Sequence, residues 1–228
     1  MDKPFCNHIP LTRIQKLIGE RMLKSEQTKP CFYVETKADI TELMSLRHKL
    51  KKSIGIKITS NAFYINVLAI AAKNYPVMVG RLDTNSIEIA DSINVGFAVN
   101  APQGLVVPVI KNADKKTLAE IAEIEALLTE KARSNKLTLE DIEGETIALS
   151  NLGAYDIDSF IGIVPPPAST ILAVGNPLPA IICANGKAIV RKIVSLSLAV
   201  DHRVINGVYA AQFLKCVKDS LQNPQELI

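Results

Sequence analysis

The sequence contains no tryptophan, and only 5% of its 228 residues are aromatic. Its charges nearly balance, with 26 Lys and Arg residues against 23 Asp and Glu residues and a formal net charge of +3. A nucleic-acid-binding protein needs a concentrated basic face for phosphates and aromatic side chains on which bases stack. The composition therefore argues against a nucleic-acid partner.

Cysteines are few, and they are scattered at positions 6, 31, 183 and 216, so that no two have the spacing of metal ligands. A chain of this length buries a sizeable core without covalent cross-links. We therefore interpret the cysteines as free thiols in a reducing compartment, and we expect no metal site.

Several well-known motifs are also missing. No Gly-x-Gly-x-x-Gly, Walker or Gly-x-Ser-x-Gly loop occurs, which argues against a dinucleotide-binding domain, a P-loop domain and a hydrolase nucleophile elbow. The longest uncharged run, residues 159–186, carries five prolines, which would break a membrane-spanning helix. The N-terminus lacks the pattern of a secretory signal. We expect no membrane partner and a cytoplasmic location, or the mitochondrial matrix in a eukaryote.

Helical and strand signals alternate along the chain. Helical periodicity or a long apolar run predicts helices at residues 11–22, 40–50, 62–72, 118–132 and 208–221. Apolar or alternating segments predict strands at residues 31–37, 93–99, 105–110, 146–149, 171–174, 181–184 and 188–200. The Asn-Gly pair at 185–186 predicts a tight hairpin between the last two strands. The fold class is α/β, a two-layer sandwich in which helices cover a mixed sheet.

Two polar residues stand where apolar strands end. His202 lies between a strand and a helix, where a neutral imidazole can act as a base for a thiol or hydroxyl. The hydroxyl of Ser150 could donate to an oxyanion. Each also has an ordinary structural interpretation, as a strand-end histidine and as a strand-to-turn cap. His8 and His48 lie in surface-like contexts and are expected to have no chemical role.

Five segments, taken together, carry a family resemblance, and they are residues 11–22, 104–110, 149–153, 165–175 and 201–207. In this order they resemble the catalytic core domain of the dihydrolipoyl acyltransferases of 2-oxoacid dehydrogenase complexes, of the pyruvate or acetoin type. That family has a fold similar to chloramphenicol acetyltransferase. The resemblance implies an acyltransferase catalytic domain at residues 11–228, preceded by an extension or linker remnant at residues 1–10.

The resemblance implies transfer of an acyl group between a dihydrolipoyl arm and coenzyme A. His202 matches the general base that takes the thiol proton, and Ser150 matches the hydroxyl that stabilises the oxyanion. The matching substrate channel is formed by Gly104, Leu105, Val106 and Pro108. Coenzyme A is then a substrate, the lipoyl group is carried on another domain, and no metal takes part.

The resemblance also implies an assembly. In the family the site lies between subunits of a homotrimer, and trimers build a cubic or dodecahedral shell that works with a 2-oxoacid or acetoin dehydrogenase and dihydrolipoamide dehydrogenase. Residues 150–160 look most like the pyruvate and acetoin members, so acetyl is the expected acyl group. The apolar residues 227–228 would suit a docking plug. The family's lipoyl and subunit-binding domains are missing from this sequence, through trimming or because the natural protein is a free-standing core.

Two positions depart from the family pattern. Asn206, which we count with the catalytic residues, stands where the family usually has Asp, and Gln15 stands where it usually has Arg. In the family these two charges pair and hold the active loop, to which Arg203 and Gly207 give structural support. Because losing one charge alone would strand the other, we predict that Gln15 and Asn206 form a neutral amide hydrogen bond instead.

Other functions remain open at this point. A free-standing enzyme could acetylate a small acceptor with coenzyme A. A non-catalytic scaffold could have kept the core assembly while its active loop decayed, for which Asn206 is the sequence indication. An unrelated α/β domain is disfavoured, because too many family segments occur in order.

Overall fold

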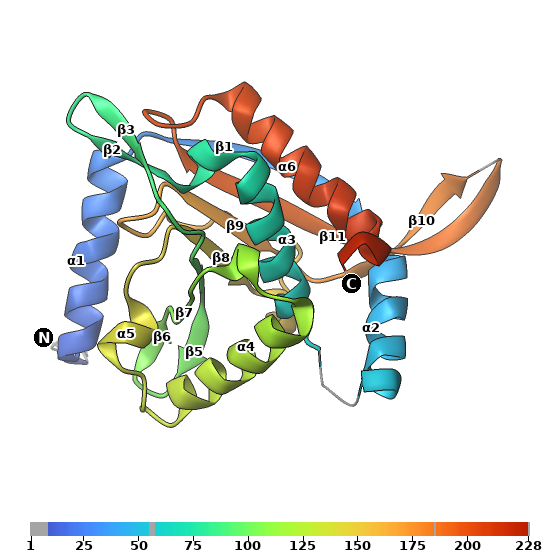
Figure 1. The fold of residues 1–228 in the computed structure, drawn as a ribbon, viewed down its shortest axis with the longest axis horizontal. Helices are drawn as coiled ribbons and strands as arrows, with labels where there is room; N and C mark the ends of the chain where they lie inside the picture. Colours follow the sequence, from blue (N-terminus) through green and yellow to red (C-terminus); the bar gives the residue numbers. More distant parts are fainter. Residues whose placement is uncertain (1–8, 55–57, 185, 228) are drawn as a thin grey trace, which may run out of the picture.

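The computed structural model describes residues 9–54, 58–184 and 186–227. Its centre is a seven-stranded mixed sheet in the order β1-β11-β9-β8-β4-β7, with β10 paired to β11 (Figure 1). These strands are β1 (Cys31–Asp39), β4 (Val95–Phe97), β7 (Val109–Ile110), β8 (Ile147–Asn151), β9 (Thr170–Val174), β10 (Leu178–Ala184) and β11 (Lys187–Asp201). The pairs β4–β8 and β8–β9 are parallel, and the other pairs are antiparallel.

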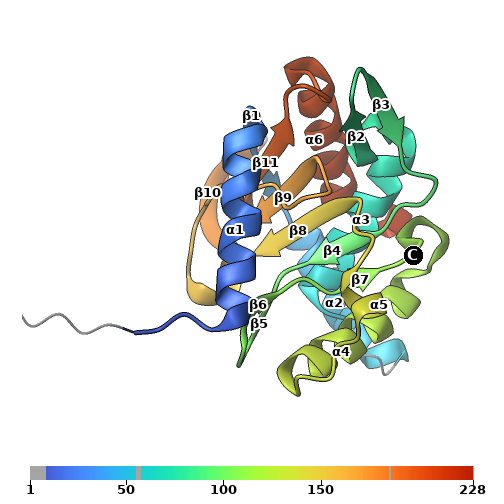
Figure 2. The same ribbon diagram turned by 90° about the vertical axis from the view of Figure 1, so that its left-hand side faces the viewer.

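Helices cover both faces of this sheet unequally. One face packs against most of them: α2 (Thr41–Ile54), α3 (Ser60–Asn74), α4 (Leu118–Arg133) and α6 (Gly207–Gln222). The opposite face is crossed by α1 (Arg13–Thr28) (Figure 2). The main apolar core lies on the side with more helices, and a smaller cluster of Ala148, Val164, Ile171 and Ala199 lies on the other. The predicted sandwich of a mixed sheet and helices is confirmed.

Shorter elements connect these layers. They are the hairpins β2 (Gly80–Asp83) with β3 (Ser86–Ile89) and β5 (Val99–Ala101) with β6 (Gly104–Val106), the short helix α5 (Leu139–Ile142) and four 3₁₀ turns at Pro76–Val79, Ala113–Lys115, Gly153–Tyr155 and Pro224–Leu227. The predictions of single strands at residues 93–99 and 105–110 are wrong, because the chain leaves the main sheet after β4, forms the separate β5–β6 hairpin and returns to the main sheet as β7.

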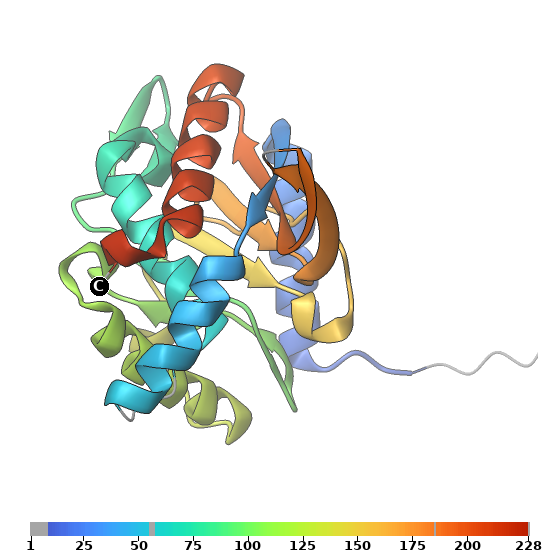
Figure 3. The same ribbon diagram turned by 90° about the vertical axis from the view of Figure 1, so that its right-hand side faces the viewer.

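Local signals account for several boundaries. Thr12 and Thr117 each cap a helix through a capping box, which satisfies backbone N–H groups that have no partner within the helix. The predicted β10–β11 hairpin is present and extends from the body as a two-stranded arm (Figures 1 and 3). Gly186 in its turn has a φ of +72°, whereas Asn185 lies outside the described residues. Ile181 and Val190, which pair across the arm, are both exposed.

Predictions were also made for the two ends of the chain, residues 1–10 and residues 227–228. Leu227 is buried against the core of its own chain, so the prediction that residues 227–228 form a docking plug is wrong for Leu227, and Ile228 lies outside the described residues. Most of the expected extension at residues 1–10, with Cys6 and His8, also lies outside them. The three described cysteines are free thiols, as predicted.

Candidate active site

His202 follows the last residue of β11 and is exposed to solvent. Its backbone N–H donates to the carbonyl oxygen of Pro30 at 2.9 Å. Its imidazole ring meets the ring of Phe32 edge to face, with 5.1 Å between ring centroids and 75° between ring planes. Such a contact favours one ring orientation over free rotation. His202 is therefore an accessible imidazole in a defined position.

The turn that carries His202 is held by a buried carboxylate. Asp201 is 1% exposed and accepts two hydrogen bonds from the guanidinium of Arg203, at 2.9 Å and 2.7 Å. The backbone N–H groups of Val204 and Ile205 donate to the Asp201 carbonyl. The hydrogen bonds to Asp201 raise the pKa of Arg203, so the guanidinium stays charged. Arg203 thus supports the turn that carries His202.

Gly207 is required by close packing against the same aromatic ring. A Cβ atom at this position would lie 2.9 Å from Cε1 of Phe32 and 3.0 Å from its Cζ. A larger residue would therefore displace the ring on which His202 rests. Phe32 was not identified from the sequence, although its pairing with Val200 across β1 and β11 places it beside the histidine turn.

The predicted hydrogen bond between Gln15 and Asn206 is wrong within this chain. The Asn206 side-chain oxygen accepts from the backbone N–H of Tyr209 at 2.9 Å and caps α6. The Gln15 side-chain oxygen accepts from the backbone N–H of Thr12 at 2.9 Å in the capping box of α1. Within the described part of the chain, no hydrogen bond joins them, because each amide oxygen satisfies the N-terminus of its own helix.

Ser150 lies near the end of β8 and lines an elongated cavity of about 440 Å³ between α1 and the sheet. Leu105 and Val106 line this cavity, as expected for channel residues. Gly104 instead forms the β5–β6 turn with a φ of +123°, and the carbonyl of Pro108 accepts from Phe97 at 3.0 Å. The structure therefore brings two of the four expected channel residues to Ser150.

The residue after Ser150 shapes the turn that ends β8. The Asn151 side chain donates to Asn61 on α3 at 2.8 Å and accepts from the backbone N–H of Gly153 at 2.9 Å. A Cβ atom at Gly153 would lie 2.6 Å from the carbonyl oxygen of Gly175. The Ser-Asn-Leu-Gly segment is thus a tight turn that anchors the end of the strand.

Ser150 and His202 do not meet within one chain. Ser150 aligns with Ala173 on β9, and Ala173 aligns with Ser197 on β11, five residues before His202. At the rise of an extended strand, five residues correspond to roughly 16 Å along the sheet, with two strand spacings to add. A hydroxyl and an imidazole this far apart cannot act on one carbonyl group.

A buried acid at the other end of the cavity escaped sequence reasoning. Glu145 is 4% exposed, and its Oε1 lies 3.4 Å from Nη2 of Arg21. Burial raises the pKa of Glu145 to about 7, although Arg21, Lys29 and Lys111 act in the opposite direction. Its sequence context, Gly-Glu-Thr before a strand, resembles an ordinary exposed turn, so no local signal marks it.

Two features are absent from residues 9–54, 58–184 and 186–227. No group of three or more His, Cys, Asp or Glu side chains there is placed to hold a metal ion. No helix there has the length and apolar character needed to cross a membrane.

Comparisons with known proteins agree with this geometry. Residues 5–228 match the family model for the 2-oxoacid dehydrogenases acyltransferase (catalytic domain). The acetyltransferase component of the pyruvate dehydrogenase complex of Rickettsia bellii is 34% identical over 94% of this chain and 52% of its own length. The succinyltransferase component of the 2-oxoglutarate dehydrogenase complex of Cupriavidus necator is 33% identical over 96% of the chain and 54% of its own length. The chain spans about half the length of these curated relatives.

Solved structures show the same relationship. Azotobacter vinelandii dihydrolipoamide acetyltransferase, solved in a study of a serine, a histidine and an asparagine in its catalytic mechanism, superposes with a TM-score of 0.93 at 32% identity. The match covers 97% of this chain and 93% of that one. Chloramphenicol acetyltransferase, at 16% identity and a TM-score of 0.58 over 89% of this chain and 94% of its own, shares the fold alone. The chain therefore belongs to the acyltransferase catalytic-domain family of the 2-oxoacid dehydrogenases.

Proposed function

We propose that this chain transfers an acyl group, expected to be acetyl, between a dihydrolipoyl arm and coenzyme A. One observation carries the proposal: Ser150, His202 and Asn206 are separated by 52 and 4 positions, as are the serine, histidine and asparagine studied in the Azotobacter enzyme. Asn206 therefore matches a relative whose asparagine was studied as part of a catalytic mechanism. This match removes the sequence indication for a decayed scaffold.

The proposed chemistry needs one base and one hydrogen-bond donor. The imidazole of His202 takes the proton from the thiol of coenzyme A, a weak acid for which a modest base is sufficient. The thiolate attacks the carbonyl carbon of the acyl-lipoyl thioester, and the hydroxyl of Ser150 donates to the resulting oxyanion. The intermediate then breaks the carbon–sulfur bond to the arm, and the imidazolium returns its proton to the departing sulfur. Acyl-coenzyme A and the dihydrolipoyl arm are the products.

The separation of the two residues supports a shared site. Because His202 and Ser150 of one chain lie too far apart, the proposal pairs His202 of one subunit with Ser150 of a neighbour in a homotrimer. Such trimers would form the core shell of a 2-oxoacid or acetoin dehydrogenase complex, with dihydrolipoamide dehydrogenase as a further partner. Overall identity to acetyl and succinyl relatives is nearly equal, so the preference for acetyl depends on residues 150–160.

The test is acetyl transfer from acetyl-coenzyme A to free dihydrolipoamide, measured together with the mass of the protein in solution. His202→Ala and Ser150→Ala are each expected to lower turnover about a hundredfold or more while the assembly stays intact. Unchanged turnover in either variant would contradict the assigned role. Absence of turnover by the intact assembly would contradict the proposed reaction and favour a different acceptor.

A further inference from the structure

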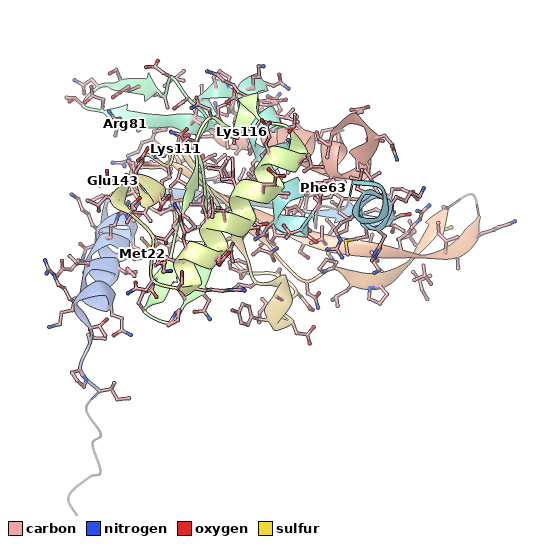
Figure 4. All side chains as sticks on the ribbon, turned by 60° about the horizontal axis from the view of Figure 1, so that its bottom comes forward. Met22, Phe63, Arg81, Lys111, Lys116 and Glu143 are labelled. Carbon is pink, nitrogen blue, oxygen red and sulfur yellow. The ribbon has the colours of Figure 1, made fainter. Side chains whose placement is uncertain are left out.

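The cavity next to Ser150 is lined by two different polar groups, a hydroxyl and a buried carboxyl. Ser150 lies near the end of β8, whereas Glu145 lies two residues before that strand begins, and both line the same cavity. The Glu145 carboxyl reaches Gly96 on β4, which aligns with Ala148, two residues or roughly 7 Å along β8 from Ser150. Between the two groups the wall is mainly apolar, and Met22 contributes to it from α1 (Figure 4). The shape suits an extended aliphatic chain with a polar group at the Glu145 end.

The carboxyl group of Glu145 has an unused acceptor. Its Oε2 atom is buried and has no hydrogen-bond partner among the described residues. A Cβ atom on Gly96 would lie 2.6 Å from this oxygen, so the glycine leaves the space that the carboxyl occupies. A buried polar atom without a partner is costly, which indicates that a donor from outside the chain completes the site.

The neighbouring cations do not supply that donor. Arg21 approaches the other oxygen, Oε1, and also donates to the carbonyl of Pro166. The ammonium group of Lys29 donates to the carbonyl of Ala168. The ammonium group of Lys111 likewise donates to the carbonyl of Glu143, beside which it lies in Figure 4. Each of the three positive charges near Glu145 thus contacts a backbone oxygen. None of them donates to Oε2, which lies at the cavity wall beside Val107.

We propose that Glu145 is a specificity-determining residue, whose free carboxyl oxygen accepts a hydrogen bond from the amide N–H of an aliphatic arm that lies in the cavity with its sulfur end at Ser150. The inference rests on the proposed function, since both proposed substrates carry amide-bearing arms: dihydrolipoyl-lysine and the pantetheine part of coenzyme A. An arm that ends in a carboxylate would place two acceptors against each other and, once Glu145 ionises above about pH 7, two negative charges as well. The cavity therefore selects neutral, amide-bearing arms.

Kinetics of the assembled protein with dihydrolipoamide and with dihydrolipoic acid, which carries a carboxylate in place of the amide, test this selection. The wild type is expected to prefer dihydrolipoamide through KM. Glu145→Gln, whose side-chain amide can donate to a carboxylate, is expected to reduce that preference at least about tenfold with little change in kcat. Glu145→Ala is expected to raise the KM for dihydrolipoamide about tenfold. The exposed Glu143→Gln removes a nearby charge and serves as the matched control.

The two possible arms give different results. A change confined to dihydrolipoamide and dihydrolipoic acid places the lipoyl arm in the cavity, whereas a rise confined to the KM for acetyl-coenzyme A places the pantetheine arm there. Equal KM values in wild type and all Glu145 variants for both substrates would overturn the inference. If the wild type shows no turnover, calorimetric binding of dihydrolipoamide and dihydrolipoic acid to wild type and Glu145→Gln decides the same question independently of the reaction. Equal affinities in that measurement would overturn it as well.

Discussion

Replacing Glu145 by Gln is expected to stabilise the protein at alkaline pH and to change little in acid. Burial raises the pKa of this carboxyl from its ordinary value of 4.5 to about 7. The native protein therefore holds the proton more tightly than the unfolded chain does. The stability that this difference contributes is complete below pH 4.5 and is lost as the pH rises through about 7.

The size of the effect follows from the two pKa values. A difference of about 2.5 pH units, at about 1.36 kcal/mol for each unit, corresponds to about 3 kcal/mol. No discount for solvent screening applies, because the side chain is 3% exposed. Gln keeps the shape and one acceptor oxygen but cannot ionise, so the variant does not lose this free energy of unfolding above neutral pH. A domain is typically stable by only about 5–15 kcal/mol, which makes the change measurable.

Urea denaturation at about pH 5 and about pH 8.5 measures this effect at one fixed protein concentration, since assembly also contributes to stability. Glu145→Gln is expected to exceed the wild type by about 3 kcal/mol at the higher pH and by less than about 1 kcal/mol at the lower pH. Glu143→Gln, two residues earlier in the chain but exposed, should show neither difference. An equal effect of Glu145→Gln at both pH values would refute the reasoning, because it would mean that ionisation of Glu145 is not the cause.

Three further predictions concern the active loop and the shared site. Mixing unfolded His202→Ala and Ser150→Ala chains and refolding them together should restore activity at up to about a quarter of the sites, because some neighbouring pairs supply one intact copy of each residue; no recovery would place the site within one chain. Gly207→Ala should push the Phe32 ring against its neighbours and lower turnover at least about tenfold with a reduced melting temperature, whereas unchanged turnover would show that the ring does not position the imidazole. Asn206→Ala should cost about 1 kcal/mol in urea denaturation through the lost cap of α6, and a double-mutant cycle with Gln15→Ala should show no coupling between the two.

The parts of the fold that were predicted correctly depend on local chemistry. The β10–β11 hairpin follows from a turn sequence between two apolar strands. The split of residues 93–99 into β4 and β5 was not predictable in this way. Alternating polarity marks extended chain but does not say to which sheet it belongs.

The same distinction between local and long-range information applies to the residues of the site. Ser150 and His202 were candidates from the sequence because each stands where an apolar strand ends, and the family resemblance gave them their expected roles. Phe32 and Glu145 were missed because their roles depend on neighbours more than a hundred residues away in the chain, His202 and Arg21 respectively. The predicted hydrogen bond between Gln15 and Asn206 was wrong for a related reason. The sequence does not show whether an amide side chain caps its own helix or bonds to a distant partner.

The sequence by itself determined the five longer helices, most strands of the main sheet, the family and the two residue types on which the proposed chemistry depends, because these follow from periodicity and motif order. Only the tertiary structure decided where those residues lie: His202 and Ser150 far apart on one sheet, and Glu145 buried at the far end of the Ser150 cavity. The physical reason is that strand register and burial are properties of the packed chain. The same Glu side chain has an ordinary pKa in water and a raised one in an apolar wall.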